Sequence, residues 1–245
     1  MPFVHNIQLN LDLDLVLRRI ESGPQKRLRS GFKTLVIELL DFVKDHNLLK
    51  PAMAYQYVSP KDLFPDESRL KEIEKLKGSL VSMVLPAARE LALVVVTIGA
   101  ALEKKVSAYS RQKALLRAMI LDSIGSAALD TLTIEASNII DCDIESRGFK
   151  ASSPLSPGMP GIPLFDQKRM FELIPAEKIG VCLNTSQLMI PQKSISMIIG
   201  TGPDMPVWTL AQVCARCSLK NTCGHRILPG KSKCIKIDNM EKKII

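Results

Sequence analysis

Aromatic residues are scarce in this chain, since Phe, Tyr and Trp make up 4% of its 245 residues and only one Trp is present. With 46% apolar residues the chain can still fold, so its core must be aliphatic. The sequence contains no cluster of basic and aromatic side chains of the kind that binds nucleic acid, and we expect no nucleic-acid partner. The net charge of +8 favours an acidic protein partner or a solvated basic surface.

Long uninterrupted apolar runs are also missing. The most apolar window, residues 80–102, contains Pro86, Arg89 and Glu90, which interrupt a membrane span and favour a passage from a buried helix to a buried strand. Residues 1–20 lack the basic start and apolar run of a secretory signal. We therefore expect a cytoplasmic protein with no membrane partner, in which six cysteines favour metal binding over disulfides.

Catalytic motifs are absent as well, because the sequence has no nucleophile–base pair, no paired carboxylates in a motif and no complete phosphate loop. The nearest match is the turn at residues 97–99, which follows a Val-rich strand at 91–96 and precedes a helix starting at Ala100. It has one glycine and no Lys-Ser/Thr pair, so we predict a tight turn there. Whether the chain is itself an enzyme stays open.

Hydrophobic periodicity predicts both helices and strands, in no repeating βαβ order. Strands are expected at residues 4–9, 53–58, 91–96, 180–183 and 194–199, and helical segments at 14–20, 27–45, 70–77, 114–140 and 165–173. The helix at 114–140 carries small residues around Gly125, which allow close packing, and residues 142–153 are expected to form a connector. We predict an α+β fold, a twisted antiparallel sheet with flanking helices.

Proline recurs at a fixed spacing in the second half of the chain. Four prolines fall three residues apart, and two glycines repeat with them, in the order Pro154, Pro157, Gly158, Pro160, Gly161 and Pro163. Polyproline II has three residues per turn, so we predict a ribbon whose prolines share one edge. The glycines would leave the backbone open to a ligand.

This ribbon and the bend after it resemble the activation (reactivation) domain of vitamin B12-dependent methionine synthase. The family carries Arg-Pro-x-Pro-Gly-Tyr-Pro, followed by Leu-Thr-x-Ser-x-x-Met-x-Pro-x-x-Ser-Val-Ser. Matching residues are Pro157, Gly158 and Pro160 in the first motif, and Leu183, Ser186, Met189, Pro191, Ser194 and Ser196 in the second. The likeness extends more weakly over most of residues 1–200. The chain resembles most the short, stand-alone versions of the domain.

The resemblance implies that the domain binds S-adenosylmethionine beside the cobalamin of a partner protein. The implied cofactor-binding residues are Pro157, Gly158, Met159, Pro160, Ser186, Met189 and Ser194, with Glu135 as the acidic residue on the long helix. The family's ribbon arginine, which grips the carboxylate of S-adenosylmethionine, aligns with Pro154 here, and its tyrosine aligns with Met159. Arg147 or Lys150 are the neighbouring candidates for that charge, although neither is in register.

The C-terminal part carries four cysteines with metal-ligand spacing. Cys214, Cys217, Cys223 and Cys234 follow the pattern C-x2-C-x5-C-x10-C, and four thiolates suit either zinc or an iron–sulfur cluster. His225 is an alternative fourth ligand, and four free or redox-active thiols are the plain alternative. The iron–sulfur option is favoured because reactivation needs a low-potential electron. We expect residues 1–200 to form the activation-like domain and 201–245 a Cys-rich appendage, whereas Cys182 should lie in the core.

Two functional hypotheses follow from the resemblance. In the first, the chain is an activation subunit of cobalamin-dependent methionine synthase, a methyltransferase of methionine biosynthesis. It would bind to a corrinoid protein or a truncated methionine synthase and position S-adenosylmethionine as methyl donor to cobalt, with an acidic electron donor such as flavodoxin or ferredoxin. In the alternative, it is a non-catalytic electron-transfer or docking module with an iron–sulfur or zinc site.

Overall fold

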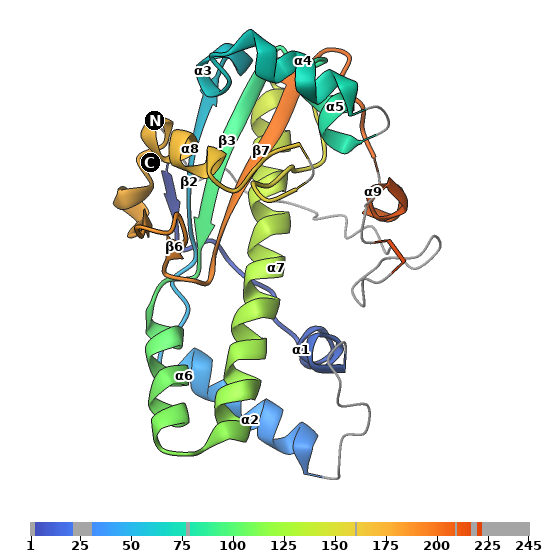
Figure 1. Cartoon of the computed structure of the whole chain (residues 1–245). Coiled ribbons are helices and arrows are strands. Elements are labelled where there is room, and N and C mark those ends of the chain that lie inside the picture. The colour runs from blue at the N-terminus through green and yellow to red at the C-terminus, as the bar shows by residue number, and fades with distance from the viewer. Residues whose placement is uncertain are drawn as a thin grey trace.

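The computed structural model describes residues 3–21, 31–76, 79–159, 161–208, 210–216 and 220–221. Its centre is a curled sheet of five antiparallel strands in the order β1-β2-β3-β7-β4 (Figure 1). The strands are β1 (Phe3–His5), β2 (Ala52–Val58), β3 (Glu90–Thr97), β7 (Ser194–Gly202) and β4 (Lys150–Ala151). Helices flank the sheet, which confirms the predicted α+β fold with an antiparallel sheet.

Strand β3 lies in the middle of the sheet and is covered on both faces. Its register with β7 runs from Glu90 opposite Thr201 to Thr97 opposite Ser194. The six residues Leu91–Val96 are all fully buried. Because both faces are covered, the strand reads as a continuous apolar run and not as an alternation of apolar and polar residues.

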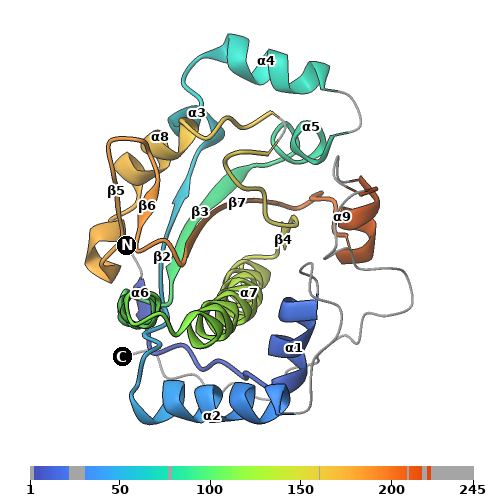
Figure 2. The same ribbon diagram turned by 60° about the horizontal axis from the view of Figure 1, so that its bottom comes forward.

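Helix α7 (Leu115–Glu145) covers one face of the sheet and extends well beyond it. Figure 2, which looks nearly along this helix, places it on one side of β3 and β7, with the chain after β4 and helices α3, α5 and α8 on the other. Its residues Leu132, Ala136 and Ile140 pack against odd-numbered β7 residues such as Met197. The predicted connector at 142–153 is wrong at its start, since α7 continues to Glu145 and Lys150–Ala151 form β4.

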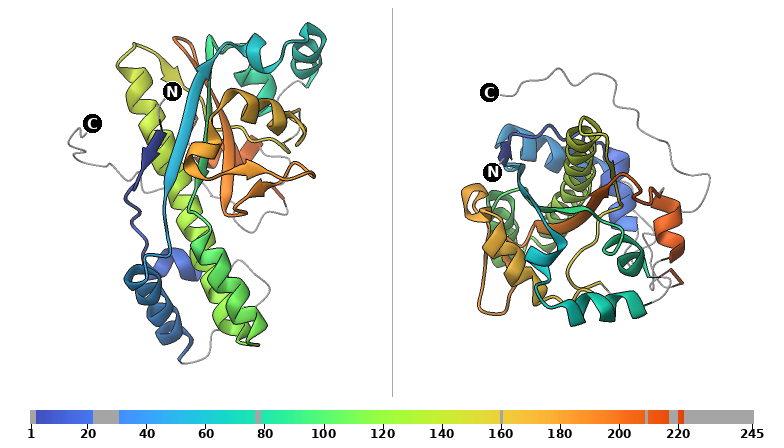
Figure 3. Two further views of the ribbon diagram at one scale, coloured as in Figure 1. Left: turned by 90° about the vertical axis from the view of Figure 1, so that its left-hand side faces the viewer. Right: turned by 90° about the horizontal axis from the view of Figure 1, so that it is seen from above.

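The other half of α7 is surrounded by three helices, α1 (Leu13–Glu21), α2 (Phe32–Asp45) and α6 (Ala101–Arg111). They form a second aliphatic core beyond the end of the sheet (Figure 3, left). The small-residue prediction is confirmed here, because a Cβ on Gly125 would lie 2.8 Å from the Leu102 side chain. A larger residue at this position would push α6 away from α7.

The second face of the sheet is covered by short elements. They are α3 (Pro60–Leu63), α4 (Glu67–Lys75), α5 (Leu80–Val84), α8 (Asp166–Leu173) and the 3-10 helix η1 (Ala176–Ile179). A two-stranded hairpin, β5 (Cys182–Leu183) and β6 (Met189–Ile190), lies beside them, and α9 (Leu210–Arg216) follows the sheet. None of the helices in the described ranges is both long and apolar enough to span a membrane.

The predicted boundary at residue 200 falls within β7, which ends at Gly202. Met205 is buried in the core that covers the second face of the sheet. Most of the chain beyond Arg216 lies outside the described residues. The division into an activation-like domain at 1–200 and an appendage at 201–245 therefore stays a prediction.

Candidate functional site

The first part of the Pro-Gly ribbon lies along the free edge of β7. Ser152 N donates to Gly200 O over 2.9 Å, and Ser152 Oγ accepts from Gly200 N. Leu155 and Ile198 exchange both backbone hydrogen bonds at 2.8 and 2.7 Å. The ribbon thus continues the pairing begun by β4 and closes the edge of the sheet, which explains why an extended segment is stable here.

The second part of the ribbon is a turn, so the prediction of one continuous polyproline helix is wrong. Gly158 and Gly161 have φ values of 94° and 97°, in the left-handed region that glycine tolerates. Gly158 N donates to Ile162 O over 2.7 Å. The reversal lets Leu155 and Ile162 both reach full burial, which a straight ribbon would not allow.

The turn leaves the predicted ligand-binding residues partly open. Gly158 is exposed, Pro157 and Met159 are half-buried, and Pro160 lies outside the described residues. A pocket of about 330 Å³ lies beside the turn, lined by Glu72, Ile73, Leu76, Met159, Gly161 and Pro163. The ribbon is therefore packed on one side and accessible on the other.

The bend after α8 holds the second motif in a hairpin. Asn184 Oδ1 accepts from the backbone N–H groups of Ser186 and Leu188, each over 2.9 Å, and so caps the turn. The Ser186 side chain is exposed and Met189 packs against the same core as Met159. Asn184, and not Ser186, thus supplies the turn-capping group, which leaves Ser186 accessible.

Ser194 is buried at the start of β7. Its hydroxyl lies 2.7 Å from Pro191 O and 2.9 Å from Thr97 Oγ1. Thr97 Oγ1 also accepts from Gly99 N, and Gly99 has a φ of 77°, so residues 97–99 form the predicted tight turn. Ser194 therefore joins the base of the hairpin to this turn.

Gln167 is a buried polar residue that the sequence analysis did not single out. It is 2% exposed, and it connects α8 to β7 and to the hairpin. Its Oε1 accepts from Ser196 Oγ over 2.8 Å, while its Nε2 donates to Gln187 O over 2.8 Å. The even-numbered serines of β7 face this layer, and a buried serine requires such a partner.

Glu135 lies apart from the ribbon and the hairpin. It is half-buried on α7, which packs on the face of the sheet opposite α8. None of the contacts among the described residues joins it to the ribbon turn or to Ser186. The structure thus brings Met159 and Met189 onto one layer and leaves Glu135 on the other.

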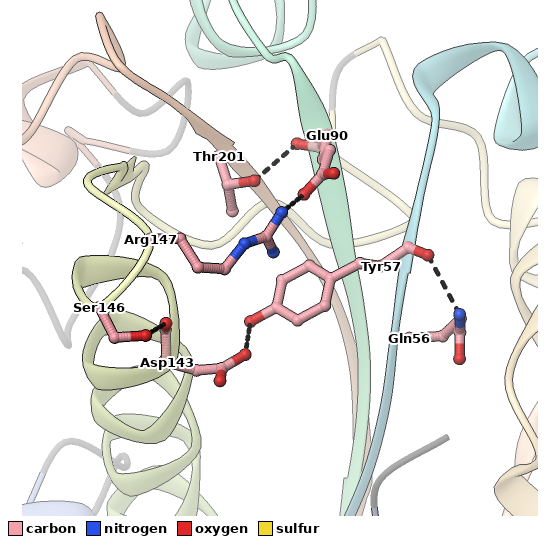
Figure 4. Close-up of polar contacts among 7 residues, drawn as sticks. All are labelled: Gln56, Tyr57, Glu90, Asp143, Ser146, Arg147 and Thr201. Carbon is pink, nitrogen blue, oxygen red and sulfur yellow. Dashed lines mark hydrogen bonds and ion pairs between the residues drawn. The ribbon is translucent and has the colours of Figure 1, made fainter.

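A polar cluster occupies the α7 face where β2 and β7 end and β3 begins (Figure 4). The Tyr57 hydroxyl donates to Asp143 Oδ2 over 2.6 Å. Arg147 forms an ion pair with Glu90, whose backbone carbonyl accepts from Thr201 Oγ1 over 3.2 Å. Local hydrogen bonds from Gln56 to Tyr57 O and from Ser146 to Asp143 O flank the cluster.

Arginine and aromatic side chains stack around the same cluster. The guanidinium of Arg147 lies 5.1 Å from the centre of the Tyr57 ring and 5.3 Å from that of Phe149. Arg89 lies 5.4 Å from the Phe149 ring centre. Sequence analysis proposed Arg147 as a ligand-binding cation but missed Tyr57, Asp143 and Arg89. The Tyr-x-Tyr pair of a buried strand was the available signal, because buried tyrosine hydroxyls require partners.

The environment of Tyr57 makes the stability of the fold sensitive to alkaline pH. Burial, the hydrogen bond to Asp143 and the charge of Asp143 raise the pKa of Tyr57 above its ordinary value of 10.0. The folded state therefore holds this proton more tightly than the unfolded chain. Its stabilisation is complete below about pH 10 and is lost as the pH rises from there toward the folded-state pKa.

We expect Tyr57→Phe to lower the free energy of unfolding at pH 7 by about 1.5 kcal/mol, because Asp143 loses a charge-assisted hydrogen bond. The difference from wild type should shrink above pH 10, measured by urea unfolding at both pH values. Asp143→Asn, which keeps an oxygen acceptor, is the matched control and should cost less. An unchanged gap above pH 10 would contradict this account of the Tyr57 proton.

The cysteine prediction falls mainly outside the described residues. Cys214 lies on α9 and is half-exposed, whereas Cys217, Cys223 and Cys234 are not among the described residues. Within the described ranges, no three His, Cys, Asp or Glu side chains are grouped as metal ligands. The placement of Cys182 in the core is wrong, since its side chain is exposed on the hairpin, outside the five-stranded sheet.

Comparison with known proteins supports the fold and not the sequence family. No protein-family model matches the chain, and no curated protein matches it. Among solved structures, the chain is similar to the crystal structure of the MetH reactivation domain bound to AdoHcy, with a TM-score of 0.52 and 12% sequence identity. The match covers 86% of this chain and 82% of the other. At this level of identity the likeness establishes a shared fold.

Proposed function

We propose that this chain supports the reductive reactivation of a corrinoid methyltransferase such as methionine synthase, by holding S-adenosylmethionine as methyl donor to cobalt. The observation that carries the proposal is the fold likeness to a reactivation domain over 86% of the chain. The motifs of the ribbon and the hairpin indicate the same domain independently of that likeness. The bound AdoHcy of the neighbour, S-adenosylhomocysteine, is the product that methyl transfer from S-adenosylmethionine leaves.

The chemistry belongs to the substrate and to the partner's cofactor. S-Adenosylmethionine supplies the methyl group, an external donor such as flavodoxin or ferredoxin supplies one electron, and S-adenosylhomocysteine leaves. The contribution of this chain is to bind and orient the methyl donor, so that catalysis rests on proximity. The ribbon turn and hairpin, with Gly158, Met159 and Ser186 partly or fully accessible, are the proposed surface for this task.

Exposed apolar side chains beside the ribbon support docking of a partner. Leu164, Phe165, Leu188 and Ile190, which we call the docking face, are 41 to 67% exposed. Leu164 and Phe165 accept the backbone hydrogen bonds of the first turn of α8, and Gln167 in that turn bonds the hairpin next to Leu188. Exposed apolar patches of this kind are typical of interaction sites.

The direct test is spectroscopic. A corrinoid methyltransferase that lacks its own reactivation domain is prepared in the cob(II)alamin state and mixed with this chain, reductant and S-adenosylmethionine. We expect the cob(II)alamin absorbance to give way to that of methylcobalamin only when the chain is present. Phe165→Asp and Leu188→Asp should each reduce the rate roughly tenfold or more, as loss of a central apolar contact does.

Leu115→Asp is the matched control. Leu115 is 66% exposed at the start of α7, away from the docking face, so this substitution should leave the rate unchanged. The proposal fails if this chain forms no methylcobalamin with a methyltransferase that is restored when its own reactivation domain is added back. Titration calorimetry with S-adenosylmethionine then separates the hypotheses, because the electron-transfer or docking module would bind the partner and give no heat with S-adenosylmethionine.

We further propose that the C-terminal part of the chain, predicted as an appendage at 201–245, binds a metal with Cys214, Cys217, Cys223 and Cys234 as ligands. The support is the spacing of the cysteines, since four thiolates within about twenty residues suit zinc or an iron–sulfur cluster. Metal and sulfide analysis after anaerobic purification tests it. Iron with sulfide, or zinc alone, would identify the site, and a metal-free chain would overturn the proposal.

A further inference from the structure

The connection from α6 to α7 forms one end of the molecule, and α3, α4 and α5 lie at the other end (Figure 1). Three apolar side chains are exposed at this connection. Leu115 is 66% exposed, Leu116 47% and Met119 37%. They occupy the first two turns of α7, so they form one patch and are not scattered singly over the surface. We call residues 111–119 the tip.

The charge around this patch has one sign. Residues 104–121 contain five basic residues and no acidic one, so nothing within this segment offsets the positive charge. Arg117 is paired with another element, because its guanidinium lies 2.8 Å from Glu38 Oε1 of α2. Arg111 and Lys113 are exposed, and among the residues that the structure describes no carboxylate lies within ion-pair distance of either.

Neighbouring parts of α7 do not compensate this charge. Asp122, the next acidic residue along the helix, is held by Lys193, whose Nζ lies 2.9 Å from Asp122 Oδ1. The first turn of α7 carries no acidic residue, so the positive end of the helix dipole adds to the charge of the cations. The tip therefore combines exposed apolar side chains with an uncompensated positive potential.

This combination is suited to an anionic lipid surface, where apolar side chains enter the boundary with the acyl chains and cations meet the headgroups. A connection at the end of two helices can place both leucines on a flat surface at once. A second copy of the chain fits less well, because its own Arg111 and Lys113 would face the same cations. We propose that the tip binds an anionic lipid surface as a peripheral contact. The contact requires no membrane span, and it goes beyond both the proposed function and the sequence-based expectation of no membrane partner.

Co-sedimentation with lipid vesicles tests the proposal. We expect the chain to bind vesicles of phosphatidylcholine mixed with phosphatidylserine, and not vesicles of phosphatidylcholine alone. Leu115→Ser should weaken binding roughly tenfold, because the inserted apolar side chain is lost. Lys113→Gln should weaken it roughly fivefold, which is what one cation near a charged membrane contributes. Added salt should weaken binding of the wild type, since it screens the same attraction.

Val207→Ser and Lys61→Gln are the matched controls. Val207 is as exposed as Leu115, and Lys61 is an exposed cation on α3, at the other end of the molecule. Both variants should bind the mixed vesicles nearly as wild type does. Equal weakening by Lys61→Gln and Lys113→Gln would overturn the proposal, because net charge alone would then cause the binding.

Two further results would count against a lipid surface. Wild type that does not bind the mixed vesicles would refute the proposal, and binding to soluble polyglutamate in their place would assign the tip to an acidic protein. Sedimentation of wild type as a dimer and of Leu115→Ser as a monomer would assign it to a second copy of the chain. The reactivation assay contains no lipid, so the proposed function stands or falls independently of these results.

Discussion

Gly200→Val is expected to lower the free energy of unfolding by about 3 kcal/mol, because the site is already filled and overpacking strains its neighbours. A Cβ at Gly200 would lie 2.7 Å from Val84 Cγ1 and 2.8 Å from Met205 Cε. Met205 is long enough to turn aside. Val84 is fully buried and stiff at χ1, so the strand itself would have to move.

Moving the strand would weaken its pairing with the ribbon, because both backbone groups of Gly200 form hydrogen bonds with Ser152. We expect amide exchange at position 200 and at Leu155 to accelerate in this variant. Urea unfolding gives the loss of stability, and exchange measured by NMR locates it. Together they would separate a local loosening of the ribbon from a general weakening of the core.

A pair of alanine variants provides the control. At Gly202, two residues along the same strand, a Cβ would meet only Arg89 N at 3.3 Å and more distant atoms. Gly200→Ala should therefore cost more than Gly202→Ala, with Gly200→Val costing most. Equal costs for the two alanine variants would contradict the assignment of the effect to Val84 and Met205.

The elements that the sequence predicts well are those whose burial is uniform along the element. The apolar run at 91–96 is covered on both faces, so its composition alone indicates a central strand. The long helix is recognisable from its apolar residues, although its end is not. Residues 141–145 are largely polar, yet Ile144 is buried against the sheet and Asp143 bonds Tyr57, and these tertiary contacts extend the helix to Glu145.

The ribbon shows the opposite case. Proline spacing predicts polyproline II, and glycine is compatible with that helix, so the pattern contains no signal for a reversal. The turn at Gly158 and Gly161 is chosen by the burial of Leu155 and Ile162, which depends on β7 and α5 being in place. Such a choice is made by the tertiary structure and is not encoded in local spacing.

The polar cluster could not be predicted from the sequence for a related reason. Tyr57 and Asp143 are 86 residues apart, and Arg147 reaches Glu90 across 57 residues. Only the pairing of β2 with β3 and the packing of α7 on both bring these side chains together. The predicted burial of Cys182 is wrong for the same reason, since its strand belongs to a small exposed hairpin and not to the five-stranded sheet.

The buried side chain of Gln167 connects α8 to β7 and to the hairpin through its hydrogen bonds to Ser196 and Gln187. Gln167→Leu is expected to lower the free energy of unfolding by about 3 kcal/mol, because the Ser196 hydroxyl and the Gln187 carbonyl both lose their partner. Leucine fills similar space, so the loss reports on hydrogen bonds and not on a cavity. The hairpin should loosen as well, which faster amide exchange at Leu188 would reveal.

A double-mutant cycle with Ser196→Ala measures the coupling energy between Gln167 and Ser196. Ser196→Ala alone should cost about 1.5 kcal/mol, since Gln167 Oε1 is left without a donor. When both residues are apolar, no group of that pair is unsatisfied, so the double variant should cost at least about 1 kcal/mol less than the sum. Lys168→Leu, an exposed change on the same helix, should shift stability by less than about 0.5 kcal/mol. Additive costs would mean that Gln167 and Ser196 act separately, and that α8 holds the hairpin by packing alone.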